Sequence, residues 1–143
     1  MASVDSEARD SSSRNERALI LVVERNPVVQ RLERYFLEQA GYSVQFASDG
    51  LSAYSVAREL KPGIIVTEIL VPELDGLSLC RKIKSDPLTA HILVLIFSHL
   101  HAEDRAREVG ADAFLVKPLS EDLLIETVEK LVAFRRAKGR PDA

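Results

Sequence analysis

Residues 63–76 read GIIVTEILVPELDG, and this stretch decides the fold that the rest of the chain follows. The aliphatic run of residues 64–66 contains no polar residue, which is typical of a parallel strand that is covered on both faces. The run is followed by a carboxylate, Glu68, and by a loop that closes on Asp75-Gly76. Parallel sheets bind ligands beyond the carboxyl ends of their strands, so we expect Glu68 to lie in a site.

Four more strands are predicted on either side of this one. They are residues 18–23 (ALILVV), 43–47 (SVQFA), 92–97 (ILVLIF) and 113–116 (AFLV). Segments with apolar residues at helical spacing alternate with the strands. The pattern is (βα)5 in the α/β class, a doubly wound five-stranded parallel sheet, because right-handed crossovers place helices on both faces.

Capping residues and helical spacing predict five helices. Four of them have a capping residue at the start, namely Asn26, Asp49, Asp75 and Ser120. In the first two helices the residues expected to face the core are Val29, Leu32, Phe36 and Ala40, then Ala53, Val56, Ala57 and Leu60. In the third and fifth they are Leu79, Cys80 and Ile83, then Leu124, Val128 and Leu131. The fourth helix offers only Ala102, Ala106 and Val109, so it should dock most weakly.

Composition narrows the class of protein. With 143 residues, 46% of them hydrophobic, the chain can bury the core of one domain. A net charge of -3 gives no general attraction to nucleic acid or to an anionic membrane. One cysteine excludes an internal disulfide, and no apolar stretch reaches the roughly 18 residues of a membrane span. Without a signal-peptide pattern, the expected location is the cytoplasm.

The chain divides into three parts. Residues 1–17 are Ser-rich and charged and have little to bury, so we predict a disordered tail. Residues 18–134 hold all the predicted strands and helices and form the domain. Residues 135–143 are predicted to form a basic tail.

Polar residues gather where the predicted strands end. They are Glu24-Arg25 after the first strand, Glu68 after the third, Ser98-His99 after the fourth and Lys117-Pro118 after the fifth. This order resembles the receiver domain of two-component response regulators, over residues 18–134. Supporting stretches are ILVVERNP, GYSVQFASDG, PELDGLSLCRKIK and VGADAFLVKP. The resemblance implies a flavodoxin-like sheet with strand order 2-1-3-4-5.

The resemblance also implies roles for these positions. In that family an acid pair binds Mg²⁺, an aspartate accepts a phosphoryl group from a histidine kinase, a hydroxyl and a lysine contact the phosphate, and an aromatic residue reports the state. By position, Glu24 and Arg25 stand at the acid pair, Glu68 at the phosphoacceptor, Ser98 and Lys117 at the phosphate contacts, and Phe114 at the switch.

Three positions depart from the family pattern. Arg25 replaces an acid, Glu68 replaces the aspartate, and His99 stands where the family usually has a small residue. The extra methylene of glutamate moves its carboxylate by about 1 Å, which can lower a rate about a hundredfold. With Arg25 and Lys117 opposite two glutamates, the formal charge of the pocket is zero, so we expect weak or absent Mg²⁺ binding and no other cofactor or metal.

Glu68 is expected to reach Lys117 or Arg25 as a charge-assisted hydrogen bond. Two interpretations of that contact stay open. Glu68 either imitates the active, phosphorylated state or forms an ion pair in a pocket that no longer signals. His99 and His101 are expected to face solvent rather than to bind a metal.

These residues favour a stand-alone pseudo-receiver, a protein-interaction module that is not an enzyme and works without phosphorylation. Its partner would be a signalling protein or a histidine kinase, with no nucleic acid and no membrane. A homodimer is possible through the fourth helix, the fifth strand and the fifth helix. The alternatives are a working phosphoacceptor on Glu68 and a small-ligand-sensing flavodoxin-like module, although the sequence has no glycine-rich phosphate loop.

Overall fold

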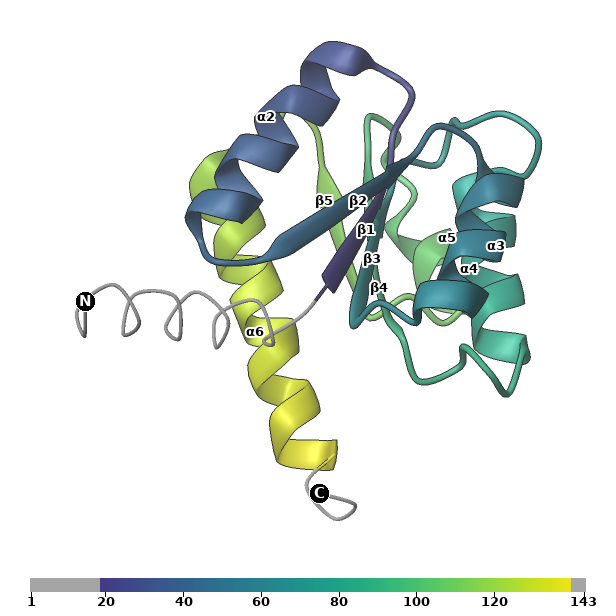
Figure 1. Ribbon diagram of the computed structural model, residues 1–143. Coiled ribbons are helices and arrows are strands. Elements are labelled where there is room, and N and C mark those ends of the chain that lie inside the picture. The colour runs from purple at the N-terminus through teal and green to yellow at the C-terminus, as the bar shows by residue number, and fades with distance from the viewer. Residues whose placement is uncertain (1–18, 140–143) are drawn as a thin grey trace.

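The computed structural model describes residues 19–139, which form a parallel sheet between two layers of helices (Figure 1). The strands are β1 (Leu19–Val23), β2 (Ser43–Ala47), β3 (Ile64–Thr67), β4 (Leu93–Ser98) and β5 (Ala113–Val116). They lie in the order β2-β1-β3-β4-β5, and every neighbouring pair is parallel. The predicted α/β class and strand order are confirmed.

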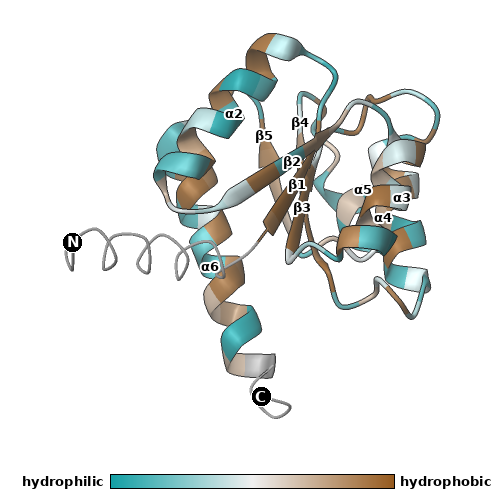
Figure 2. Ribbon diagram, viewed as in Figure 1, coloured by the Kyte–Doolittle hydropathy of each residue, from teal (hydrophilic) through white to brown (hydrophobic). Residues whose placement is uncertain are grey.

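Among the described residues, the helices are α2 (Pro27–Gln39), α3 (Gly50–Leu60), α4 (Gly76–Ser85), α5 (Glu103–Glu108) and α6 (Glu121–Gly139). Helices α2 and α6 cover one face of the sheet, and α3, α4 and α5 cover the other (Figure 1). This two-sided cover explains why the central strands have no polar face (Figure 2).

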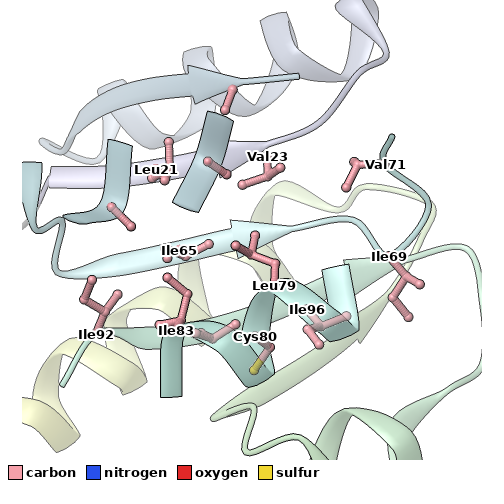
Figure 3. Close-up of a cluster of buried hydrophobic side chains, with 14 of the residues drawn as sticks. Leu21, Val23, Ile65, Ile69, Val71, Leu79, Cys80, Ile83, Ile92 and Ile96 are labelled. Atoms are coloured by element: carbon pink, nitrogen blue, oxygen red, sulfur yellow. The ribbon is translucent and has the colours of Figure 1, made fainter. Parts of the chain in front are cut away.

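The core falls into two clusters because side chains alternate along each strand. Leu21 and Ile65 point toward α3, α4 and α5, where they pack with Leu79, Cys80 and other residues (Figure 3). The residues between them, such as Ile20 and Ile64, pack under α2 and α6. Cys80 is fully buried, which confirms it as a core residue. Burial also raises the pKa of its thiol to about 11, which disfavours the reactive thiolate.

The predicted helix caps are present. Val28 donates its backbone N–H to Asn26 Oδ1 at 2.9 Å, Ser52 to Asp49 Oδ1 at 2.8 Å, Ser78 to Asp75 Oδ1 at 2.9 Å, and Leu123 to Ser120 Oγ at 3.3 Å. Helix α5 begins at Ala102 without a side-chain cap and runs for only six residues. Ala106 and the C-cap residue Val109 are its buried apolar residues, and the weak docking expected from the sequence stays a prediction.

Two predicted core faces are corrected. In α2 the fully buried residues are Glu33 and Leu37, whereas Leu32 is 43% exposed. The sheet meets the side of the helix that lies one residue beyond the predicted stripe, because Leu37 rather than Phe36 enters the core. Leu60 was expected to face inward in α3 but is exposed, since the helix ends there and Lys61 turns into the left-handed region at φ 48°.

The ends of the chain differ from the predicted division in one respect. Helix α6 continues to Gly139, past residue 134, and Arg135 Nη1 donates a hydrogen bond to the Gly63 carbonyl at 3.0 Å. The start of the predicted basic tail is therefore helical. The predicted tail of residues 1–17 lies outside the described residues. Within residues 19–139, no helix is both long enough and apolar enough to span a membrane.

Candidate functional site

The loop after β3 fixes the position of Glu68. The backbone of Gly76 approaches the end of the strand so closely that a Cβ atom there would lie 2.2 Å from the Glu68 carbonyl oxygen. Gly76 also donates its N–H to the Ile69 carbonyl at 2.9 Å. A glycine is needed at this position because any other side chain would push the loop away from the strand.

Lys117 joins the ends of β1, β3 and β5. Its Nζ atom lies 2.7 Å from Glu24 Oε1 and 3.0 Å from Glu68 Oε1. All three side chains are about 4% exposed. One cation therefore serves two buried carboxylates, and the predicted contact between Glu68 and Lys117 is present.

The second oxygen of Glu68 is also bound. Glu68 Oε2 accepts hydrogen bonds from the backbone N–H groups of Ile69 at 2.7 Å and Leu70 at 3.3 Å. The Ser98 hydroxyl donates to the same oxygen. Ser98 and Lys117, which follow two different strands, thus meet on a single carboxylate.

The pKa values agree with this geometry. Burial acts to raise the pKa of Glu68, but the hydrogen bond from Ser98 and the charge of Lys117 outweigh it and lower the pKa below its ordinary value. Burial acts to lower the pKa of Lys117, but Glu24 and Glu68 outweigh it and raise the pKa. Glu68 and Lys117 are therefore both charged in the neutral range. Glu24, Glu68 and Lys117 are called the triad below.

Glu24 and Arg25 are neighbours in the sequence but differ in burial and in their contacts. Glu24 is buried, and its Oε2 atom accepts the backbone N–H of Asn26 at 3.1 Å. Arg25 is exposed, and within residues 19–139 it forms no ion pair with Glu68. Of the two partners that the sequence suggested for Glu68, the structure brings only Lys117 into contact.

A cavity of about 350 Å³ opens above the triad. Its lining consists of Glu24, Arg25, Asn26, Glu68, Leu70 and His99. His99 is 71% exposed, yet its Nδ1 atom lies 3.4 Å from Glu68 Oε1. The expectation that His99 and His101 face solvent is met for His101, whereas His99 also contacts the site. Among the described side chains, no group of three His, Cys, Asp or Glu residues is arranged to hold a metal ion.

Phe114 lies on β5, away from the triad. It is partly buried and packs against the core cluster under α3, α4 and α5. It also lines a groove of about 820 Å³ between α5 and β5, together with Leu100 and Val116. The position expected to report the state of the site therefore borders an accessible surface.

Sequence reasoning missed one residue near the site. Glu33, on α2, is 1% exposed, and Glu24, Lys117 and Glu68 are the charges that act on its carboxyl group. Leu37, one turn further along the helix, marks the same buried face. No local sequence signal identifies Glu33, because the apolar stripe through Leu32 and Phe36 indicates a face one residue away from it.

Comparison with known proteins assigns the family. Residues 20–129 match the response regulator receiver domain family. The chain is 34% identical over 113 residues to the polar-differentiation response regulator DivK of Brucella anthropi, covering 77% of this chain and 92% of DivK. It is 33% identical over 127 residues to the DNA-binding dual master transcriptional regulator RpaA of Synechocystis, covering 87% of this chain and 52% of RpaA. It is also 37% identical over 121 residues to the response regulator PleD of Caulobacter vibrioides, covering 82% of this chain and 27% of PleD. This chain therefore spans about half of RpaA and about a quarter of PleD.

Solved structures that resemble this chain are also receiver domains. The signal receiver domain of a histidine kinase from Syntrophus aciditrophicus is 31% identical, with a TM-score of 0.76 over 81% of this chain and 90% of that one. The receiver domain of sensor histidine kinase PA1611 from Pseudomonas aeruginosa, solved with a magnesium ion in its active site cleft, is 25% identical, with a TM-score of 0.75 over 81% of this chain and 98% of that one. With the family match and the strand order, these similarities show that this chain belongs to the receiver domain family of two-component response regulators.

Proposed function

We propose that this receiver domain is a pseudo-receiver, an interaction module of two-component signalling that works without phosphorylation and has no enzymatic activity. One observation carries the proposal. Ser98 and Lys117, the side chains that the family resemblance assigns to the phosphate, both contact the carboxylate of Glu68. The groups that would receive phosphoryl oxygens are engaged by the residue at the phosphoacceptor position.

The contacts that the Glu68 carboxylate makes oppose phosphoryl transfer to it. The reaction needs a carboxylate oxygen in line with the leaving group, and its rate depends on position. Here Oε1 faces Lys117 and His99, and Oε2 accepts from Ser98 and two backbone N–H groups. An attack from either oxygen would require Glu68 to leave these partners first.

The residues present do not fit Mg²⁺. This ion requires near-octahedral oxygen ligands and usually keeps several waters. The two carboxylates available to it, Glu24 and Glu68, are already bridged by Lys117. The residue after Glu24, where the family resemblance implies a second acid, is Arg25. A divalent cation would have to displace the Lys117 ammonium group. We therefore propose that Mg²⁺ binding is weak or absent.

We propose that this chain signals through a surface that binds another protein. The groove between α5 and β5 exposes Leu100 and is bordered by Phe114, and α5 is anchored by the buried residues Ala106 and Val109. A short helix with few buried residues can shift at low cost in free energy when a partner binds. The partner would be a signalling protein such as a histidine kinase, or a second copy of this chain, and we expect the interaction in the cytoplasm.

The pocket contacts fit two kinds of output. In one, Glu68 holds Ser98 and Lys117 as a phosphate would, so the partner surface is always in its active form. In the other, the pocket is only an ion pair and the surface has one form with no signal. Substitution of Glu68 by alanine separates them, because only the first predicts that the amide resonances of Phe114 and α5 change.

The test of phosphorylation is intact-mass spectrometry after incubation with Mg²⁺ and acetyl phosphate. The comparison is between the wild type and Arg25→Asp/Glu68→Asp, which restores the residue types of the family. Arg25→Asp/Glu68→Ala, which has no acceptor carboxylate at residue 68, is the control. We expect no phosphoryl adduct on the wild type or the control and an adduct on the double aspartate variant.

An adduct on the wild type that maps to Glu68 would contradict the proposal. It would make this chain a working phosphoacceptor regulator awaiting its histidine kinase. If neither the wild type nor the double aspartate variant gains mass, while their spectra show folded protein, then residues 25 and 68 are not what blocks the chemistry.

A further inference from the structure

Glu33 is an acidic residue at a buried, core-facing position of α2. It lies on the sheet-facing side of α2, one turn before the buried Leu37, and is 1% exposed. Its Oε1 atom is buried and accepts no hydrogen bond from the described residues. Burial of a carboxyl oxygen without a hydrogen-bond donor favours the neutral form of the carboxyl group. The other fully buried residues of this layer, such as Ile20 and Leu124, are apolar.

The charges around Glu33 come from the triad. Burial and the charge of Glu24 raise its pKa to about 8, Lys117 acts in the opposite direction, and Glu68 adds a smaller increase. These groups stand at the carboxyl ends of β1, β5 and β3. The charges of the triad therefore act on the Glu33 carboxyl group, which is buried on the sheet-facing side of α2.

Among residues 19–139, the elements that pack against α2 supply no hydrogen-bond donor to Glu33 Oε1. Strand β2 has no acidic or basic side chain in residues 43–47. Helix α6 contributes Leu124 and Val128 to this cluster, and its Glu129 accepts the Tyr42 hydroxyl at 2.9 Å. On α2 itself, Arg34 is exposed and pairs with Glu38.

We propose that Glu33 is a proton-binding site that controls how Lys117 is shared between Glu24 and Glu68. With Glu33 neutral, the buried cluster has two carboxylates and one ammonium group, and Lys117 satisfies both. With Glu33 ionised, three carboxylates compete for one cation. The field of the new charge draws Lys117 toward α2 and weakens its hold on Glu68.

The consequence is a pocket that responds to pH without phosphate or metal. Loss of the Lys117 contact leaves Glu68 Oε1 with only His99 nearby, while Oε2 keeps its backbone donors. The position of Glu68, and through it the Ser98 hydroxyl, then depends on the protonation of a residue that touches neither. This inference goes beyond the proposed function and does not rest on it.

Two backbone amides report the change directly. The Ile69 amide donates to Glu68 and the Asn26 amide donates to Glu24, so their proton shifts follow the two carboxylates that Lys117 bridges. The experiment is an amide NMR titration of the full chain from pH 6 to pH 9 in metal-free buffer, with the Glu33 side-chain carboxyl followed by its carbon resonance. Because the His99 imidazole lies beside Glu68, every protein in the series carries His99→Asn.

We compare the His99→Asn parent with two variants of it, Glu33→Gln and Glu38→Gln. Glu33→Gln keeps the size of a neutral glutamate, and Glu38→Gln removes an exposed acid from the same helix as a matched control. In the parent and in the Glu38→Gln variant, the Ile69 and Asn26 shifts should follow a transition with the same midpoint as the Glu33 carboxyl, near pH 8. In the Glu33→Gln variant both shifts should be flat.

Three results would overturn the proposal. The Glu33 carboxyl could be fully ionised at pH 6, the two amides could be flat in the parent, or the same transition could persist in the Glu33→Gln variant. If Glu33→Gln does not fold, Glu33→Leu takes its place with the same predicted flat profile. A purely structural role for Glu33 would alter stability in these variants but would give no shared transition in the parent.

Discussion

Within the part of the chain that the structure describes, two lysine–carboxylate sites lie at opposite edges of the sheet, and they differ in the ratio of positive to negative groups. At the amino-terminal edge, Lys84 Nζ pairs with Asp112 at 2.9 Å and donates to the Ile92 carbonyl at 2.8 Å. Asp112 in turn accepts the Val94 N–H at 2.8 Å. Both side chains keep about a fifth to a quarter of their surface exposed. In this site one cation pairs with one anion, and each also forms a hydrogen bond with a backbone group.

The site at the carboxyl edge has no such balance. Lys117 pairs with two carboxylates that are as buried as itself, and the charges of all three groups act on the carboxyl group of Glu33. The difference shows two ways in which a fold can hold a partly or fully buried lysine. At the amino-terminal edge one carboxylate pairs with one ammonium group, whereas at the carboxyl edge two buried carboxylates share one ammonium group.

The largest expected effect on stability comes from removing the ammonium group of Lys117 at the carboxyl edge, where it pairs with two carboxylates. Lys117→Met leaves Glu24 and Glu68 buried together without a counter-charge. Breaking a buried pair in this way costs about 3 to 5 kcal/mol in the free energy of unfolding. Chemical denaturation of Lys117→Met measures it, with the exposed Lys130→Met as the control. A loss below about 1 kcal/mol would mean that the triad is solvated like a surface pair.

The second effect is the pH dependence that Glu33 imposes on stability. Its pKa is raised from 4.5 to about 8, so the folded chain binds a proton that the unfolded chain releases between these values. The free energy of unfolding must therefore fall as pH rises through this window. At 1.36 kcal/mol per pKa unit, this shift corresponds to a total loss of about 5 kcal/mol, of which about 4 kcal/mol falls between pH 5 and pH 9.

The measurement for this second effect is the free energy of unfolding at several pH values between 5 and 9, for the wild type and Glu33→Gln. The difference between the two proteins isolates Glu33 from other titrating groups. The wild type should lose stability relative to Glu33→Gln as pH rises. A constant difference would show that Glu33 ionises in the folded chain as it does in the unfolded one.

A smaller effect is expected from the hydroxyl of the carboxyl-edge site. Ser98 is fully buried and donates to the charged Glu68, so Ser98→Ala should lower the free energy of unfolding by about 2 kcal/mol. The amide proton of Leu100, which donates to Ser98 Oγ at 3.2 Å, should shift as well. Ser85→Ala, at an exposed serine of α4, is the control and should have a much smaller effect.

The smallest effect belongs to the balanced site. Lys84→Met should cost about 1 kcal/mol, because the pair is partly exposed and Asp112 keeps its bond to the Val94 N–H. The same denaturation measurement applies. If Lys84→Met costs as much as Lys117→Met, the contrast between the two edges is wrong.

The sequence was sufficient for the fold because each element has its own local signal. Strands such as β3 and β4 are continuous aliphatic runs, and Asn26, Asp49 and Asp75 cap helices through contacts within three residues. The sequence was also sufficient to predict that Glu24, Glu68, Ser98 and Lys117 lie at one edge, because the carboxyl ends of parallel strands share that edge.

The details of the site depend on contacts that no local pattern encodes. The orientation of Arg25 into solvent and the approach of His99 to Glu68 depend on side-chain rotamers. The burial of Glu33 depends on which side of α2 meets the sheet, and an apolar stripe that included Leu32 pointed one residue away from it. A charged residue on a core-facing position breaks the pattern that would otherwise identify the face.

The central claim, that Glu68 holds the pocket in a state that phosphate cannot change, is tested most directly by an amide NMR titration with Mg²⁺ and beryllofluoride, which imitates an acyl phosphate. The wild type should show no shifts at Ile69, Ser98 or Phe114, while Arg25→Asp/Glu68→Asp should show shifts that extend from Ser98 to Phe114. Saturable shifts in the wild type that reach Phe114 would contradict the claim and would show a working switch.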